Sequence, residues 1–458
     1  MPSLGSILSV ASTALRTQQE AINVTAHNIA NASTEGYSKQ RPVLSQLPPQ
    51  RTPTGIFGSG VVVSDVQRIR AGHLDSAYRA ESGEYREQEV RSGILGQLEI
   101  ILSEPGEGGL STTLDQFFSA WSSLATNPTS TSARGAVREQ GSLLSGQMKS
   151  LAADLDILRQ DTEARLLSSV DRVNDLAVSV ARLNREITAS ESSGETAGDL
   201  RDARDRAIDE MATLIPVQVM ERENGGVGIL TSGVGLVDGA NHGALEVRLS
   251  GGTVELGLQG HSSSLTDLGA RIGGMIQVLN NDLPAVRASL DELAEALVTE
   301  INILHQTGTN PDGDTGVEFF DSTGVTASTI GLSAAVAASA SAVSAGTGGA
   351  AGEYRAGTND IALALAGFRD APNGSLGVSF ATHFRKLATD VGFSVRSSLD
   401  SVEVHQTLSE QADVRRQSFS GVSTDEELVK LIEFQTAYSA AARVITVADE
   451  LLDTLLRM

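Results

Sequence analysis

The chain has 458 residues, of which 40% are hydrophobic, and 57 acidic against 34 basic residues give a formal net charge of −23. This length exceeds one ordinary domain, and the acidic excess disfavours nucleic acid or an anionic membrane as a partner. The absence of cysteine excludes disulfides and cysteine-based metal or nucleophile sites. Aromatic residues are only 4% of the chain, which favours helices packed through small side chains.

The chain begins and ends with apolar stripes at spacings of three and four residues, a pattern typical of helices that pack against other helices. The first stripe contains Leu4, Leu8, Ala11, Leu15, Gln18, Ile22, Thr25 and Ile29; the second contains Leu428, Leu431, Gln435, Tyr438, Ala442, Ile445, Asp449, Leu452 and Leu456. An isolated helix of this length is marginal in water, so each stripe needs a partner. We therefore expect segments 1–36 and 405–458 to form a coiled coil with each other and with neighbouring copies. The polar members Gln18, Gln435 and Asp449 either specify register or lie at the edge of the seam.

The first helix is expected to end near Asn31, because Asn28 and Asn31 belong to a run of residues that compete for backbone hydrogen bonds. Gly36 follows and can adopt a positive φ. Residues 37–73 contain four prolines, which exclude helix, and a run of three valines at 61–63 that predicts a short strand. We interpret 37–73 as an extended arm, with Gly36 and Tyr37 as the hinge between helix and arm.

The rest of the chain predicts a mainly α fold. Residues 74–215 and 261–404 have helical periodicity and are expected to form a helical middle domain, broken at 105–109 and at 127–128. In the long helix from Leu144 to Ile187, a step of eight between Leu158 and Leu166 predicts local unwinding. Alternating acids and arginines at 199–205 predict ion pairs within one helix.

Two further segments of the middle region have a different character. Residues 216–260 alternate apolar and polar side chains between glycines and predict a small β module of hairpins. Residues 327–351 have low complexity and are placed in the helical domain without a predicted fold. A capping signature at 423–426 predicts the start of the last helix.

The chemistry of the sequence predicts a protein that is not an enzyme and has no cofactor. No histidines lie at metal-ligand spacing, so His27 and His305 are interpreted as polar helix residues. The glycines at 225–235 lack the spacing of a phosphate loop, and the acidic run at 310–316 lacks the acid that a calcium loop needs at Thr323. The first ten residues lack the features of a secretory signal, and no apolar run is long enough to insert in a membrane.

Two motifs at opposite ends carry a resemblance to the bacterial flagellar axial proteins. Residues 14–23, 27–31 and 34–37 are similar to the N-terminal signature of the rod, hook and hook-associated families, and residues 421–428 and 433–445 resemble their C-terminal signature. His27 stands where that family often has asparagine. Within the group the chain resembles the hook-associated protein 1 (FlgK) family, through 200–205, Leu183-Asn184, 305–308 and Phe319-Phe320.

The resemblance implies a structural protein at the junction between the flagellar hook and filament, where it adapts their mechanics. In that reading the terminal helices form the inner tube, and the implied partners are copies of the same chain, hook protein and hook-associated protein 3. It also implies an extracellular location, reached without a cleaved signal peptide through the flagellar type III export apparatus with a cytoplasmic chaperone. The assembly interface is then the apolar members of the two stripes, together with the motif residues Asn28, Asn31, Gly36 and Tyr37.

Three alternatives remain open from the sequence. A rod or hook protein shares the terminal motifs, but should have more β structure and no helix from Leu144 to Ile187. An intracellular coiled-coil scaffold accounts for the periodicity alone. A cell-wall hydrolase needs paired acids in a cleft, and residues 216–260 offer no obvious pair.

Overall fold

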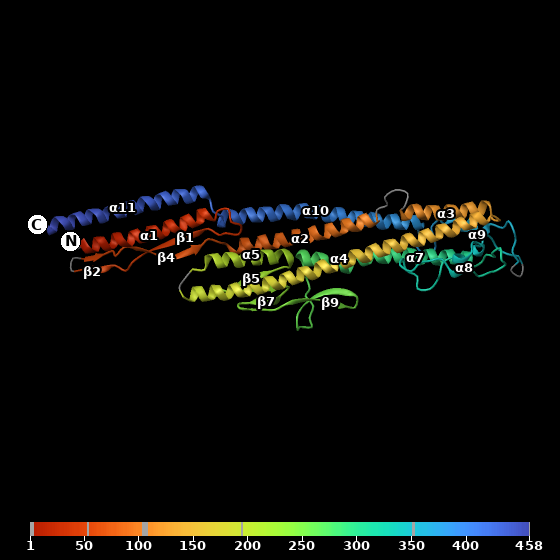
Figure 1. Ribbon diagram of the computed structural model, residues 1–458, viewed down its shortest axis with the longest axis horizontal. Coiled ribbons are helices and arrows are strands. Elements are labelled where there is room, and N and C mark those ends of the chain that lie inside the picture. Colours follow the sequence, from red (N-terminus) through yellow and green to blue (C-terminus); the bar gives the residue numbers. More distant parts are fainter. Residues whose placement is uncertain (1–3, 53–54, 103–108, 194–195, 350–352, 458) are drawn as a thin grey trace.

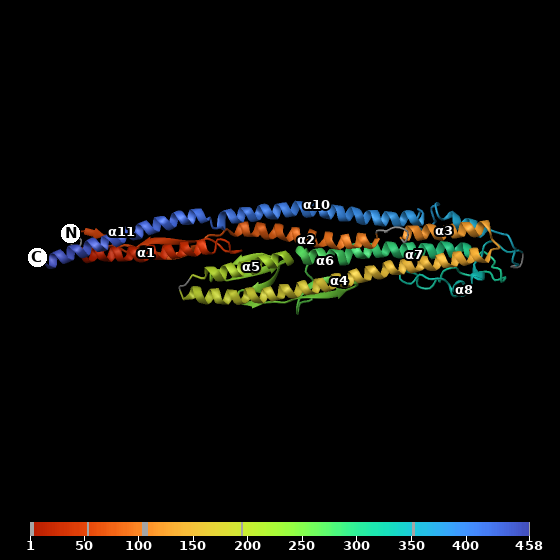
Figure 2. The same cartoon turned by 45° about the horizontal axis from the view of Figure 1, so that its top comes forward.

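The structure is a computed structural model that describes residues 4–52, 55–102, 109–193, 196–349 and 353–457. The molecule is a long rod with both chain ends at the same end (Figures 1 and 2). Helices dominate it, with a few small antiparallel sheets, so the predicted mainly α fold is confirmed. The two ends of the rod are built differently, and we describe them as a terminal unit and a body.

The terminal unit consists of α1 (Leu4–Ala30), α11 (Thr424–Leu456) and four short strands. Strand β1 (Gln40–Gln46) pairs antiparallel with β4 (Val61–Arg68), and β2 (Gln50–Thr52) pairs with β3 (Gly55–Phe57). This β ribbon lies along α1, where the Thr17 hydroxyl donates to the Val61 carbonyl at 2.8 Å. The arm that the sequence predicts as extended is therefore a folded ribbon that covers the chain's own first helix.

The body is a bundle of helices along the rest of the rod. Its members are α2 (Gly72–Leu102), α3 (Leu110–Thr126), α4 (Thr131–Ser192), α5 (Gly198–Leu214), α6 (Ala270–Gln277), a π-helical turn (Val278–Asp282), α7 (Leu283–His305), α8 (Ala334–Ala338), a 3-10 turn (Ala340–Ala342), α9 (Asp360–Gly367) and α10 (Phe380–Ser420). The predicted break at 127–128 separates α3 from α4, whereas most of the break at 105–109 lies outside the described residues. Helix α10 is unbroken to Ser420 and packs against α2, so residues 405–420 lie in the body and the chain leaves it at 421–423, not at 405.

The long helix α4 is α-helical through all of its 62 residues. Thr162 occupies the position between Leu158 and Leu166, so the buried residues follow at steps of four there, and the local unwinding of the rod stays a prediction. The Thr162 side chain is buried, and its hydroxyl is satisfied by the Leu158 carbonyl at 2.8 Å. A hydrogen-bonded threonine thus continues the buried stripe that the apolar residues alone interrupt.

The β module lies against one side of α4, at the bottom of the rod in Figure 1. A four-stranded antiparallel sheet has the order β5 (Gln218–Glu221), β6 (Val227–Thr231), β7 (Val234–Asp238) and β8 (Asn241–His242). A separate hairpin pairs β9 (Leu245–Ser250) with β10 (Thr253–Leu258). All six strands fall within the predicted range 216–260.

An aromatic cluster fills the end of the body farthest from the chain termini. Phe117, Trp121 and Phe319 lie with ring centroids 5.4–6.2 Å apart. His305 packs edge-on against Phe319; one of its ring nitrogens lies 2.7 Å from the Val317 carbonyl and the other accepts from the Ser344 amide at 2.9 Å. This histidine therefore holds the low-complexity segment, whose described residues 327–349 are ordered and contribute buried alanines and valines to the core.

Five asparagines on helices or in the π-helical turn each bind both peptide groups of one residue in a neighbouring non-helical segment. In every case the side-chain amide donates to the carbonyl and accepts from the N–H of the same residue, at 2.7–3.1 Å: Asn28 with Gln40, Asn174 with Leu245, Asn184 with Val227, Asn280 with Val254, and Asn302 with Phe320. We call these contacts asparagine clamps. They satisfy strand and loop peptides that face a helix and have no ladder partner there.

Replacing Asn184 with Leu should destabilise the body, because leucine keeps the shape but leaves the buried Val227 N–H without its acceptor. The expected loss is about 1–3 kcal/mol of unfolding free energy for each buried group left unpaired. Chemical denaturation followed by circular dichroism measures it, with Asn241→Leu in exposed β8 as the control. Equal stability of the two variants would contradict the role of the clamp.

A second prediction concerns acid. Burial, and to a lesser extent the charge of Arg134, lowers the pKa of His305 from 6.5 to about 4. Between these values the unfolded chain binds the proton and the folded chain does not, so stability is expected to fall as pH drops from 6.5 to about 4, by roughly 3 kcal/mol. His305→Gln should remove this part of the pH dependence, and His261→Gln, at an exposed position, should keep it. Unchanged pH profiles in both variants would refute the assignment.

Candidate functional site: a polar joint between the terminal unit and the body

Asn28, one of the predicted motif residues, is the hub of the terminal unit's inner edge. It is 1% exposed, and besides clamping Gln40 it accepts from the Tyr37 hydroxyl at 2.8 Å and donates to Glu427 in the first turn of α11 at 2.8 Å. All four hydrogen-bonding positions of its amide are thus occupied. One side chain therefore joins α1, the start of the ribbon and the start of α11.

Glu427 and Lys39 complete this connection to α11. The Glu427 carboxylate is 1% exposed and also lies 3.6 Å from Lys39 and 2.8 Å from Lys430. Burial alone would lower the pKa of Lys39, but Glu426, at 3.0 Å, and Glu427 outweigh it and raise that pKa. Ser423 caps α11 by accepting from the Glu426 amide, as the capping signature predicts. Glu426 itself turns to Lys39 instead of closing the capping box.

The loop between α1 and β1 turns towards the body at the remaining motif residues. Asn31 donates to the His27 carbonyl at 3.0 Å and so closes the last turn of α1. Gly36 has φ +73°, the positive φ expected from the sequence, and a Cβ there would lie 2.5 Å from the Arg206 side chain. His27 packs edge-on against Tyr37. Burial, followed by the charges of Asp199, Asp202 and Glu427, raises the pKa of Tyr37, which therefore stays a neutral donor.

A network of arginines and aspartates fixes this loop and the ribbon to the body. Arg68, at the end of β4, binds Asp202 at 2.7 Å and Asp205 at 2.5 Å, both on α5, and the Ser38 amide donates to Asp202 at 3.0 Å. Arg70 binds Asp75 at 2.7 Å and Asp205 at 3.3 Å. Within the body, the Asp209 carboxylate forms ion pairs with Arg79 and Arg416, each at 2.6 Å.

The electrostatics of this network favour the charged forms of Asp205 and Arg70. Asp205 is largely buried, which by itself raises the pKa of its carboxyl, but Arg70, Arg68 and Arg79 outweigh burial and hold that pKa below its usual range. Burial lowers the pKa of Arg70, and Asp205 and Asp75 more than compensate. Removing one partner would leave an uncompensated buried charge, which is far costlier than losing a surface ion pair.

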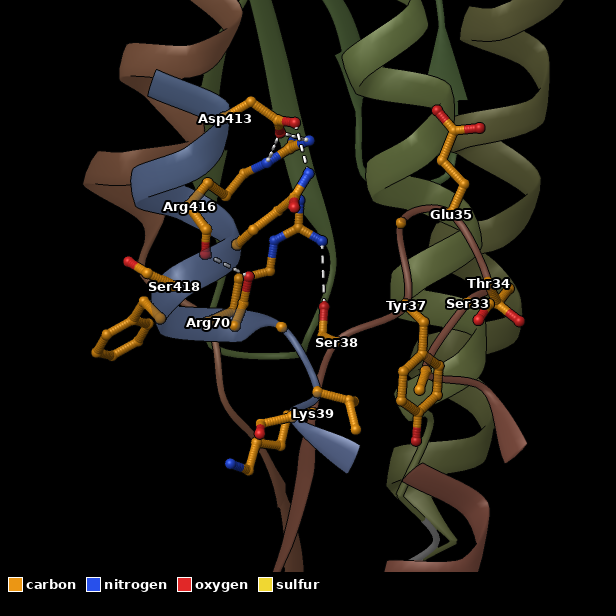
Figure 3. A pocket seen from close by; sticks show the side chains of 18 of the residues that line it. Ser33, Thr34, Glu35, Tyr37, Ser38, Lys39, Arg70, Asp413, Arg416 and Ser418 are labelled. Carbon is orange, nitrogen blue, oxygen red and sulfur yellow. Dashed lines mark hydrogen bonds and ion pairs between the residues drawn. The ribbon is translucent and has the colours of Figure 1, made fainter. Parts of the chain in front are cut away.

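A polar cleft of about 500 Å³ opens beside the network. Figure 3 shows the end of α10, with Asp413, Arg416 and Ser418, on one side, and the loop from Ser33 to Tyr37 on the other. The Arg416 guanidinium lies 3.8 Å above the Tyr78 ring, so the end of α10 is held in place on the body side. The joint is thus packed on one side and open on the other.

The predicted assembly stripes lie away from this joint, along α1 and α11. In α1 the large apolar residues Leu4, Leu8, Leu15, Ile22 and Ile29 are half-buried, and the fully buried positions belong to small or polar residues such as Ala11 and Thr25. In α11, Leu431, Ile445 and Leu452 are half-buried, Leu428 and Tyr438 are exposed, and the side chain of Leu456 lies outside the described residues. Gln435 and Asp449 are also exposed, at the edge of the seam, whereas the Gln18 side-chain oxygen is buried without a hydrogen-bond partner among the described residues.

The arginine–aspartate network is not predicted from the sequence. The acids of 199–205 are predicted to pair within their helix, but no ion pair of the described residues joins two residues of α5. Asp202, Asp205 and Asp209 share one face of α5, and that spacing was the available signal of an acidic face turned towards a partner. The described residues hold no group of acids and histidines suited to a metal ion, and none of the described helices is long and apolar enough to span a membrane.

Comparison with known proteins agrees with this architecture. Residues 95–320 match the family model of the flagellar hook-associated protein FlgK helical domain. The ends match models of the wider flagellar group: residues 8–37 the flagella basal body rod protein, and residues 416–458 the C-terminal part of the flagellar basal body rod FlgEFG proteins.

Two relatives in other bacteria are named flagellar hook-associated protein 1. Flagellar hook-associated protein 1 of Bacillus subtilis is 28% identical over 97% of this chain and 96% of its own length. That of Escherichia coli is 26% identical over 69% of this chain, which spans 60% of the relative's length. The solved flagellar hook junction protein FlgK from Burkholderia pseudomallei shares the fold, with a TM-score of 0.64 and 14% identity over 75% of this chain and all of that chain.

The paired terminal helices, their motifs and the helical body define a flagellar axial protein. Within that class the chain matches the FlgK family through residues 95–320, and its relatives are named flagellar hook-associated protein 1.

Gly36→Val should strain the loop, because a β-branched residue at φ +73° is costly and its Cβ would displace Arg206. We expect impaired incorporation into flagella, since the loop sets how α1 meets α5, while the melting temperature of the body stays nearly unchanged. Gly146→Ala, at an exposed site in α4 where an added Cβ meets nothing within 4 Å, is the control. A large loss of body stability in Gly36→Val would show that the loop is part of the core.

Proposed function

We propose that this chain is a structural, non-enzymatic component of the bacterial flagellum that forms the junction between hook and filament and adapts their mechanics. Similarity to the FlgK family supports a position at the junction between hook and filament. The observation that carries an assembly role is that α11 has apolar side chains on two opposite faces, of which this chain covers one.

The covered face of α11 packs against α1, the helix that it contacts along the rod. Its half-buried and buried members recur at three and four residues: Leu431, Phe434, Ala437, Ala441, Ile445, Ala448 and Leu452. The opposite face presents Val429, Ile432, Val447 and Leu451, which are 51–62% exposed. A helix that is apolar on both sides is typical of one packed between two neighbours.

We infer that the second neighbour is the terminal unit of another axial subunit. The end segments match models named for rod proteins, so the terminal unit is the part that this chain shares with other axial proteins. A surface common to several chains suits contacts among them, and head-to-tail contacts of that kind generate rings and tubes. The proposed partners are copies of this chain, hook protein below and hook-associated protein 3 above.

Two further elements of the proposal follow from the family. The chain is exported through the flagellar type III apparatus with a cytoplasmic chaperone, and it acts outside the cell. A structural role also agrees with the joint, where four aspartates are paired with arginines and stabilise the fold: Asp75, Asp202, Asp205 and Asp209.

The test combines localisation with two variants of α11. Labelled antibody on purified flagella should mark one band between hook and filament. Val447→Asp places a charge on the exposed face, so the isolated chain should fold normally yet fail to join the hook, and cells should shed filament protein. Ile445→Asp, on the face towards α1, should weaken both the terminal unit and assembly; an uncompensated buried charge costs about 3–5 kcal/mol.

Thr446→Asp is the matched control, because Thr446 lies between these two positions and is an exposed polar residue. Normal motility of Val447→Asp cells would refute the assignment of the exposed face to assembly. Antibody label along the whole hook or rod would instead indicate another axial protein.

A further inference from the structure

We propose that a groove in the body, between α2 and the free edge of β5, binds an extended, positively charged segment of a partner protein by adding it to the sheet as a further strand. The groove has a volume of about 780 Å³ and lies between the helix and the β module. This inference goes beyond the proposed place in the flagellum. It concerns the body alone, so its failure leaves the assembly proposal untouched.

Strand β5 is an edge strand with main-chain groups that face away from its sheet. It pairs with β6 on one side, and the described residues provide no strand on the other. The Arg222 N–H donates to the Gly226 carbonyl at 3.0 Å, which makes these two residues a hydrogen-bonded pair. Bonded and non-bonded pairs alternate along an antiparallel ladder, so Val219 and Glu221 direct their N–H and carbonyl groups away from β6. Among the described residues these groups have no hydrogen-bond partner, so an added strand can pair with them.

The α2 wall of the groove leaves room for a second backbone. Ser76, Ala80 and Gly83 line it at spacings of four and three residues, so one face of the helix presents only small side chains there. On the sheet side, Val217 and Leu230 are half-buried and supply apolar contacts. A strand between these walls can hydrogen-bond to the edge of β5 while its alternate side chains contact apolar residues.

A third wall of the groove is held in a fixed shape. Ser232, Asp267 and Ala270 line it, and they are the non-glycine residues with positive φ among the described residues, at 46°, 57° and 56°. The Ser232 hydroxyl donates to the Asp267 carbonyl at 3.4 Å. A positive φ is costly for such residues and persists only where the surroundings hold it. The groove is therefore shaped before a ligand binds, which lowers the entropic cost of binding.

Charge identifies the occupant. Glu84 and Asp267 are exposed in the groove and Glu221 is exposed at the end of β5, and none of them forms an ion pair among the described residues. Arg79 is the basic residue of the lining, and its guanidinium is occupied by Asp209 at 2.6 Å. A second copy is disfavoured, because its own β5 would bring another Glu221 to this edge and each chain has a net charge of −23. The occupant is therefore a separate protein with lysines or arginines in an extended segment.

The experiment measures the binding of labelled peptides to the full chain by fluorescence anisotropy. The probe is a short peptide with blocked ends that alternates valine and lysine. Two derivatives carry N-methyl groups on alternate residues, on the odd positions in one and on the even positions in the other, so each loses the N–H groups of one edge. A fourth peptide has glutamate in place of lysine.

The valine–lysine peptide should bind, and the valine–glutamate peptide should not. One of the two N-methylated peptides, and only one, should lose affinity, by about 2- to 10-fold for each main-chain hydrogen bond removed. Glu84→Gln should also weaken binding of the valine–lysine peptide. Glu210→Gln is the control for charge, because it neutralises an exposed carboxylate of α5 that pairs with Arg172.

Val219→Pro tests the edge directly. Proline removes an N–H that points away from β6, so the β5–β6 ladder and the melting temperature should stay nearly unchanged while the peptide binds more weakly. The matched control is His242→Pro in β8, the opposite edge of the same sheet, where the residue is exposed and its N–H also points away from the neighbouring strand. This variant should bind the peptide like the wild type.

Four results would overturn the inference. The first is no binding of the valine–lysine peptide. The second is binding that Val219→Pro leaves unchanged, which would place the peptide elsewhere on the chain. The third is an equal effect of N-methylation at both sets of positions, which would exclude pairing along one edge. The fourth is self-association of the full chain in sedimentation that Val219→Pro abolishes, which would make a second copy the occupant.

Discussion

The hydrophobic core of the body ends before the terminal unit begins, so charged and polar groups decide how the two parts are joined. Asp202 and Asp205 bind Arg68 at the end of the ribbon and Arg70 in the connection that follows it, and Asp209 binds Arg79 and Arg416. Buried ion pairs of this kind add little net stability compared with apolar packing, because desolvation offsets the attraction, but each is costly to break singly. The value of the network is therefore geometric. It fixes where the terminal helices point without merging them into the core.

Single polar side chains also join segments elsewhere in the molecule. A strand or loop packed beside a helix leaves peptide groups facing a surface that offers no ladder partner. Asparagine is the short side chain with the donor and acceptor of a peptide, and at five places a helix or the π-helical turn uses one to bind both groups of a single residue. Asn28 in the terminal motif and Asn184 in the body do the same work. The motif residue is thus one case of a packing rule that recurs along the rod.

Sequence reasoning succeeds here where a local signal has one structural meaning. The long helices, the strands of 216–260, the cap at Ser423 and the positive φ of Gly36 all follow from periodicity, capping or the freedom of glycine. It fails where the structural role of a pattern depends on the segment that packs against it. The spacing of Asp202 and Asp205 indicates a shared face of α5, but only the fold shows that Arg68 and Arg70 meet that face. The stripe of α1 likewise buries small residues, since the ribbon covers a side that the sequence alone leaves open.

Helix α11 connects the two properties of the terminal unit. Its first turn is anchored through Glu427 to Asn28 and Lys39, while its outer face at Val447 and Leu451 is exposed. Any neighbour that packs on this outer face acts on the helix whose other side binds α1, so a displacement is passed to α1 and the ribbon together. The connections from the terminal unit to the body are two short backbone segments, 69–71 and 421–423, and polar contacts such as those of Arg68 with Asp202 and of the Ser38 amide with Asp202. Among the described residues, no member of the body's hydrophobic core lies in α1, the ribbon or α11, so polar contacts and two short backbone connections join the helix with the exposed face to the body.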